Sequence, residues 1–173
     1  AVFDEYLHSV FTHGYSSEYF VEGGRSRTGR TLSPKAGMLA MTVRSYLRDS
    51  KKPMVFVPVY TGYEKVLEEK SYLGELRGKA KKKESLLDVL GTLRSFKKSF
   101  GKVNVTFGEP IHLSPYLEER HPGWSNQDYE ACNYRPDWAP ELVDELATTV
   151  VTEINRAASV NPINLIALAI LAS

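Results

Sequence analysis

Several features that often reveal a protein's class are scarce or absent in this sequence. The single cysteine, Cys132, excludes an internal disulfide framework and fits a reducing compartment, and no CxxC pair suggests a metal site. The 22 basic residues are almost balanced by 21 acidic ones, so the net charge is +1. This balance argues against nucleic acid or an acidic membrane as the main partner. We therefore expect no structural metal and no nucleic-acid partner, and any anion must be bound by local clusters.

The chain also lacks an initiator methionine, a signal peptide and an apolar run of 18 residues. We therefore expect both ends to have been cut from a longer protein. Residues 163–172 are apolar apart from Asn164, which makes them too short to span a bilayer and too apolar for a solvated tail. Two interpretations stay open, a helix that packs on further protein and a helix that lies on a membrane surface.

The first third of the chain alternates between helix and strand patterns. Apolar spacing predicts helices over 2–11 and 36–47, the second begun by Ser33–Pro34 as a cap and first-turn proline. Residues 18–21 suggest a short strand, and the continuously apolar residues 54–60 suggest a strand buried on both faces. This order predicts a right-handed parallel βαβ crossover. We therefore expect an α/β fold with a mostly parallel central sheet flanked by helices.

The rest of the chain gives weaker but readable patterns. The lysine run 79–83 is either solvated surface or a docking site for an acidic carrier or anionic lipid. The remaining expected elements are a helix over 85–100, an edge strand over 103–107, a short helix over 115–120, an aperiodic loop over 121–140 and a final amphipathic helix over 142–154.

The richest chemistry lies in FVEGGRSRTGR, residues 20–30. Gly23 and Gly24 let the backbone approach a ligand closely, and arginine guanidinium groups fork onto phosphate oxygens; the arginines here are Arg25, Arg27 and Arg30. The GxxxxGK[ST] and GxGxxG patterns of nucleotide loops are absent. The stretch therefore predicts a site for a small phosphorylated molecule. The alternative is a surface turn in which Glu22 pairs with one arginine.

The same stretch, followed by KAGMLAM and VFVPVYTGYEKV, closely resembles the glycerol-3-phosphate 1-O-acyltransferases of bacterial membranes and their mitochondrial relatives. The resemblance continues through YLGELRGKAKKKES, SFGKVNVTFGEPI and NPINLIALAILAS, and so covers essentially the whole chain. It implies a glycerolipid acyltransferase fold that is incomplete here. Residues 1–173 would be the C-terminal part of a single acyltransferase domain, with 141–173 a helical extension that leads into missing sequence.

The resemblance also implies which residues bind substrate. The family's third motif, implicated in binding glycerol 3-phosphate, matches Glu22, Gly23, Gly24, Arg25, Ser26, Arg27, Thr28 and Gly29, followed here by Arg30. Arg25 and Arg27 are the expected phosphate ligands. The fourth motif matches Val57, Pro58 and Val59 and would shape the pocket beside the acyl chain, although an ordinary core strand explains the same apolar residues.

The family's first motif, HxxxxD, supplies the catalytic base and is missing here, as is the arginine-bearing second motif. The nearest approach is His13 with Glu18, and we interpret His13 as an ordinary loop histidine. We therefore expect no catalytic residue and no cofactor in this chain, and little activity from the chain alone.

The resemblance implies that the parent enzyme transfers an acyl group from acyl-CoA or acyl-carrier protein to the sn-1 hydroxyl of glycerol 3-phosphate. The product, lysophosphatidic acid, begins phospholipid synthesis. By the same resemblance, the enzyme is peripheral and works on the membrane surface at the cytoplasmic face of the bacterial inner membrane. The alternative is a non-catalytic phosphate- or carrier-binding module derived from an acyltransferase.

Overall fold

A computed structural model of the chain describes residues 2–24, 26, 30–64 and 101–172. The chain divides into two compact units, which are described separately below. The first comprises Ala1–Tyr60 and Phe107–Ala157, and the second comprises Thr61–Thr106 and Ala158–Ser173. The expected helix over 85–100 and the lysine run 79–83 lie outside the described residues.

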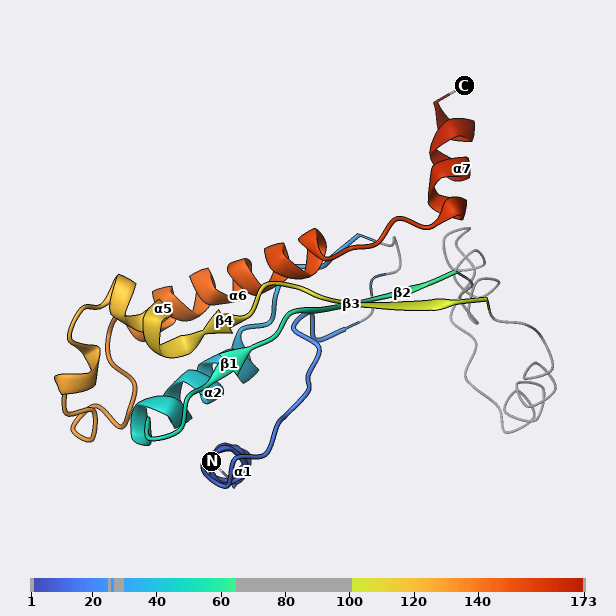
Figure 1. The fold of residues 1–173 in the computed structure, drawn as a ribbon. Helices are drawn as coiled ribbons and strands as arrows, with labels where there is room; N and C mark the ends of the chain where they lie inside the picture. Colours follow the sequence, from blue (N-terminus) through green and yellow to red (C-terminus); the bar gives the residue numbers. More distant parts are fainter. Residues whose placement is uncertain (1, 25, 27–29, 65–100, 173) are drawn as a thin grey trace, which may run out of the picture. The chain divides into compact units, whose positions relative to one another are not determined.

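The core of the first unit is built by three helices gathered around a short pair of strands (Figure 1). The helices are α2 (Gly37–Arg48), α5 (Leu113–Arg120) and α6 (Ala139–Arg156), and the strands are β1 (Val55–Phe56) and β4 (Ile111–His112). Leucines from all three helices are 0% exposed, namely Leu39, Leu113, Leu117 and Leu146. Each such side chain contributes about 1.5 to 3 kcal/mol through burial. The predicted helices over 115–120 and 142–154 are confirmed by α5 and α6.

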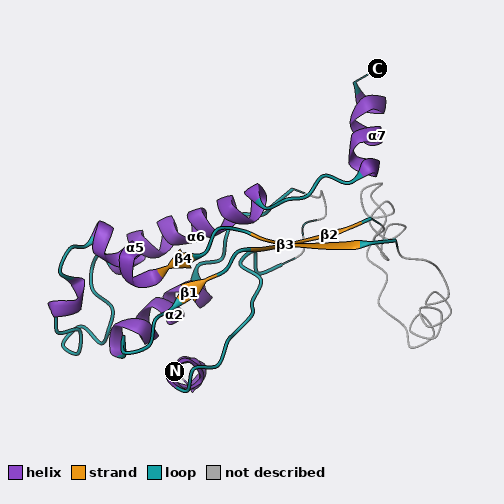
Figure 2. Ribbon diagram, viewed as in Figure 1, coloured by secondary structure: helices purple, strands orange, loops and turns teal. Residues whose placement is uncertain are grey.

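The predicted aperiodic loop is confirmed, and aromatic contacts hold it on the core. Between α5 and α6 the chain forms only the short 3-10 helix η1 (Trp124–Asn126), as Figure 2 shows. The buried Trp124 ring packs on Tyr46, with 5.5 Å between ring centroids. The Tyr129 hydroxyl donates to the Trp124 carbonyl at 2.7 Å, and His121 stacks on Trp138 at 4.3 Å. These aromatic contacts hold the loop on the core, although its apolar residues have no regular spacing that would predict a helix or a strand.

The predicted first helix is confirmed as α1 (Val2–Thr12), which packs on α2. Leu7 is its only buried residue, so polar contacts carry much of the attachment. Arg48 forks onto both carboxylate oxygens of Glu5 at 2.8 and 3.0 Å, Arg44 pairs with Asp4 at 3.2 Å, and His8 Nδ1 lies 2.8 Å from Ser45 Oγ. The hydrogen bonds from Arg48 lower the pKa of Glu5.

Two predictions for the segment before α2 are wrong. Residues 18–21 do not form a strand, because the Val21 carbonyl accepts a hydrogen bond from the Lys35 amide at 2.7 Å instead of joining a ladder. The turn that follows is closed by the Gly23 amide, which donates to Phe20 at 3.0 Å. Helix α2 begins at Gly37 and not at Ser33–Pro34, because the same Lys35 bond holds the preceding residues in the loop.

The prediction of one continuous buried strand over 54–60 is also wrong. Pro58 has no amide hydrogen for a ladder, and the chain forms β1 and then β2 (Val59–Tyr63) on either side of Val57–Pro58. β1 pairs antiparallel with β4, with Val55 opposite His112. β2 pairs with β3 (Val103–Phe107), the predicted edge strand. Two strand pairs are thus formed by the described residues, and the mostly parallel central sheet stays a prediction.

The second unit contains helix α7 (Pro162–Leu171), whose start is tied to β3. Asn104 Nδ2 donates to Asn161 Oδ1 at 2.7 Å, and the Asn161 amide donates to Asn164 Oδ1 at 2.8 Å. Beyond this cap no residue of α7 is buried, and Leu168 is 65% exposed. Within the described ranges no helix has the length and apolar character needed to cross a bilayer. The organisation as one acyltransferase domain with a helical extension stays a prediction.

Candidate functional site

The loop that carries the predicted phosphate-binding residues is closed at its base by two short hydrogen bonds. Glu22 Oε2 accepts the Leu32 amide at 2.7 Å, and the Val21 carbonyl accepts the Lys35 amide at the same distance. The described members of the predicted set are Glu22, Gly23, Gly24, Ser26 and Arg30. Arg25, Arg27, Thr28 and Gly29 lie outside the described residues. The alternative, in which Glu22 pairs with one of the arginines Arg25, Arg27 and Arg30, therefore stays a prediction.

The last turn of α6 anchors this loop, a contact that the sequence did not reveal. Thr31 Oγ1 donates to Asn155 Oδ1 at 2.6 Å across a sequence separation of 124 residues. No local pattern marks Asn155, because its role depends only on where α6 ends. Three hydrogen bonds therefore hold the loop: two close its base, and the third joins it to helix α6 of the core.

The predicted acyl-chain residues approach the same turn of α6. The Gly108 amide donates to the Pro58 carbonyl at 2.8 Å, and a Cβ on Gly108 would lie 3.0 Å from the Glu153 carbonyl oxygen. Pro58 is fully buried, whereas Val57 and Val59 are 49% and 40% exposed. The two valines thus present apolar surface and do not lie in an enclosed pocket.

Two features of the loop suit an oxyanion. Ser26 Oγ is shielded from solvent and has no hydrogen-bond partner among the described residues. Around Gly24, the space that a Cβ would occupy has no heavy atom of a described residue within 4 Å. A shielded hydroxyl without a partner is uncommon in proteins, and a ligand atom is one way to satisfy it. Open space at Gly24 lets a ligand approach the backbone closely.

The two glycines are expected to respond differently to alanine. Gly23 has φ +60°, and an added Cβ would lie 2.7 Å from Lys35 Cγ, so Gly23→Ala should lower the free energy of unfolding by about 1 to 2 kcal/mol. Gly24→Ala should change it by less than about 0.5 kcal/mol. If a phosphate occupies the space beside Gly24, this second variant nevertheless loses affinity for a small phosphorylated ligand. Urea unfolding and ligand titration of both variants check this, and unchanged affinity in Gly24→Ala would contradict it.

His13 and Glu18, the nearest approach to an HxxxxD motif, are not paired in the part of the chain that the structure describes. His13 Nδ1 donates to the Ser9 carbonyl at 2.7 Å, and among the described residues it makes no ion pair with Glu18. His8 contacts Ser45 between α1 and α2. No group of three or more His, Cys, Asp or Glu side chains in the described part of the chain is placed to hold a metal ion.

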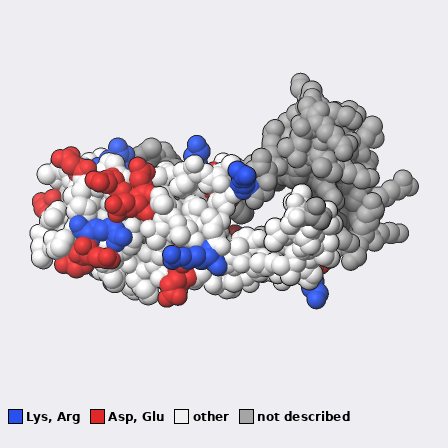
Figure 3. All heavy atoms as spheres, turned by 90° about the horizontal axis from the view of Figure 1, so that it is seen from above, with Lys and Arg blue, Asp and Glu red and all other residues white. Residues whose placement is uncertain are grey.

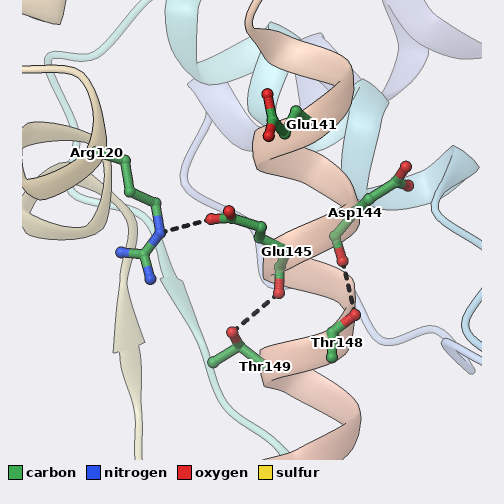
Figure 4. Close-up of a pocket in the computed structure, with 6 residues that line it drawn as sticks. All are labelled: Arg120, Glu141, Asp144, Glu145, Thr148 and Thr149. Atoms are coloured by element: carbon green, nitrogen blue, oxygen red, sulfur yellow. Dashed lines mark hydrogen bonds and ion pairs between the residues drawn. The ribbon is translucent and has the colours of Figure 1, made fainter.

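A surface hollow of about 840 Å³ in the described part of the chain does not suit an anionic substrate. It lies on the outer side of α5 and α6 and is lined by Arg120, Glu141, Asp144, Glu145, Thr148 and Thr149 (Figure 4). Arg120 is already engaged, because its Nε donates to Glu145 at 3.0 Å. Figure 3 shows acidic side chains gathered over this part of the surface. The excess of carboxylates would repel a phosphate.

Comparisons with known proteins agree on one family. The family described as glycerol-3-phosphate acyltransferase C-terminal region matches residues 72–173. A glycerol-3-phosphate acyltransferase of Pseudomonas aeruginosa strain PAO1 is 57% identical over 173 residues, which is 100% of this chain and 21% of that protein. The proteins of the same name from Pseudomonas putida strain GB-1 and Pseudomonas entomophila strain L48 are each 56% identical with the same coverage. The chain therefore spans about a fifth of the length of these curated relatives, and it belongs to the glycerol-3-phosphate acyltransferase family.

Proposed function

We propose that the protein containing this chain transfers an acyl group from acyl-CoA or acyl-carrier protein to the sn-1 hydroxyl of glycerol 3-phosphate. The product is lysophosphatidic acid, and the reaction would begin phospholipid synthesis. The observation that carries this proposal is identity of 57% along the whole chain to proteins named glycerol-3-phosphate acyltransferase. The closed, anchored loop with a shielded hydroxyl at Ser26 supports it.

In this proposal the chain contributes recognition of glycerol 3-phosphate. Arg25 and Arg27 would fork onto the phosphate oxygens, and each charge-assisted bond is worth about 1.5 to 3 kcal/mol. Ser26 Oγ would donate a further bond, while Glu22 holds the loop closed by accepting the Leu32 amide. The exposed valines Val57 and Val59 would contact the acyl chain.

The reaction also requires a base. The sn-1 oxygen attacks the thioester carbonyl, a carbon–oxygen bond forms, the carbon–sulfur bond breaks, and the hydroxyl proton passes through the base to the leaving thiolate. His13 already donates to the Ser9 carbonyl, and among the described residues it forms no ion pair with a carboxylate. We propose that the histidine of an HxxxxD motif outside these 173 residues takes this role.

An assay with labelled glycerol 3-phosphate and palmitoyl-CoA tests the proposal. The longer protein should form labelled lysophosphatidic acid, whereas the 173-residue chain alone should bind glycerol 3-phosphate without turnover. Binding without any product from the longer protein would instead support the alternative, a non-catalytic module that binds phosphate or a carrier. Failure of both proteins to bind glycerol 3-phosphate would overturn both functions.

We further propose that the protein lies on the cytoplasmic face of the bacterial inner membrane. Support comes from α7, whose exposed side chains are almost all apolar, including Leu165 and Leu168. Leu168→Asp should reduce sedimentation of the protein with phosphatidylethanolamine and phosphatidylglycerol vesicles by at least about half, because a charge in the apolar layer is costly. Val2→Asp, at an exposed valine of α1, is the matched control. If both variants sedimented with the vesicles to the same extent as the parent protein, α7 would instead pack on further protein.

A further inference from the structure

A second cavity lies in the first unit, where the start of α1, the end of α2 and the turn at 133–135 meet. Its volume is about 220 Å³, and it is lined by Asp4, Glu5, Arg44, Arg48, Asn133, Tyr134 and Arg135. A water molecule occupies about 30 Å³ in the liquid, so the cavity has room for a phosphate group and a few waters. All seven lining side chains are polar or carry a polar group.

The charges around this cavity favour an anion. Three guanidinium groups face two carboxylates, which leaves a formal charge of +1. Both oxygens of Glu5 are used by Arg48, and Asp4 pairs with Arg44. Arg135 is exposed, and in the described part of the chain its side chain forms no ion pair. Since each guanidinium carries five N–H donors, most of the donors around the cavity are left for a ligand or water.

The cavity is also organised before any ligand arrives. Arg48 is held between Glu5 and the Tyr134 ring, whose centroid lies 5.5 Å from the guanidinium carbon. Asn133 and Tyr134 have φ of 52° and 57°, a left-handed conformation that costs a non-glycine residue about 1 to 2 kcal/mol. Such strain clusters at functional sites, where the surrounding structure maintains it. Here it places Tyr134 on Arg48 and Arg135 at the cavity wall.

We propose that this cavity binds a phosphate group at a site separate from the loop at 22–32. The loop precedes the N-terminus of α2, and the cavity lies at its C-terminus. A helix of 12 residues is about 18 Å long, so one phosphate cannot reach both places. The phosphate is either free or part of a larger ligand such as coenzyme A. The site does not depend on the proposed function, because it rests on α1, α2 and the 133–135 turn alone.

Amide NMR during titration with inorganic phosphate, at constant ionic strength, tests the site. The protein used is the 173-residue chain with Arg27→Gln, because this substitution is expected to weaken phosphate binding at the loop of residues 22–32. Amides of 44–48 and 133–135 should shift, and adding Arg135→Gln should raise the dissociation constant at least five-fold. As a matched control, Lys102→Gln removes one positive charge from the second unit and should change the dissociation constant less than two-fold.

Three results would overturn the site: shifts confined to 20–35, an unchanged dissociation constant in Arg135→Gln, or equal weakening by Lys102→Gln. Titration with coenzyme A and with pantetheine, which lacks phosphate, identifies the source of the phosphate. Tighter binding of coenzyme A than of inorganic phosphate supports a larger ligand, and equal binding supports free phosphate. Equal binding of pantetheine and coenzyme A at these amides would contradict phosphate recognition.

Discussion

Replacing Arg27 with alanine is expected to raise the Michaelis constant for glycerol 3-phosphate by about 10- to 100-fold in the longer protein. A charge-assisted bond to phosphate is worth about 1.5 to 3 kcal/mol, and each 1.4 kcal/mol is a factor of ten. The Michaelis constant for the acyl donor should change less than about two-fold, because a phosphate ligand does not touch the donor. Steady-state kinetics with each substrate varied in turn measures both constants.

Two further variants make this result specific. Arg27→Lys keeps the charge but loses the planar fork, so its effect should fall between those of the parent protein and Arg27→Ala. Arg120→Ala removes an arginine from the outer side of α5, where it pairs with Glu145, and should leave both Michaelis constants nearly unchanged. Equal changes in the two constants, or none, in Arg27→Ala would remove Arg27 from phosphate binding.

The second large effect is expected at alkaline pH. Burial raises the pKa of the Tyr19 phenol to about 12, and Thr42 offsets a smaller part of that rise. Between pH 10 and 12 the unfolded chain loses this proton while the folded chain keeps it, so stability falls as pH rises. The buried neutral phenol of Tyr19 thus has its full stabilising effect below pH 10, and this effect is lost as the pH rises past 12. The resulting fall in the free energy of unfolding is about 2 to 3 kcal/mol.

Tyr19→Phe should therefore flatten the fall in the free energy of unfolding between pH 10 and 12, which urea unfolding at a series of pH values measures. Tyr15→Phe is the matched control, because Tyr15 is 70% exposed. Burial also raises the pKa of Tyr129, so some decline should persist in Tyr19→Phe. An identical decline in the parent protein and Tyr19→Phe would show that Tyr19 does not carry the effect.

The elements that sequence predicted well are those whose pattern is local. Helix α6 follows from leucines and valines four residues apart, and β3 follows from alternation ended by Gly108. The predicted strand over 18–21 failed for a reason that is not local. Residues 18–21 have the composition of a strand, but the Val21 carbonyl bonds the Lys35 amide, so no ladder forms. Strand formation depends on a partner, which local sequence does not specify.

For the candidate site too, some features could be predicted from the sequence and others could not. FVEGGRSRTGR by itself predicted the chemistry, because arginines, glycines and hydroxyls in one short segment suit a phosphate whatever surrounds them. It also carried the resemblance to the family, which the comparisons confirmed. Sequence further marked Pro58 as unusual, and this residue does separate β1 from β2.

Only the tertiary structure decided how these pieces are held. The bond from Thr31 to Asn155 and the fork from Arg48 onto Glu5 join residues far apart in the chain. The cavity at 133–135 exists only because α1, α2 and that turn meet. Side-chain type and spacing along one segment are properties of the sequence, so its chemistry can be read there. Contacts across long separations depend on which surfaces the core brings together, and this packing alone determines how the loop is anchored and where the second cavity forms.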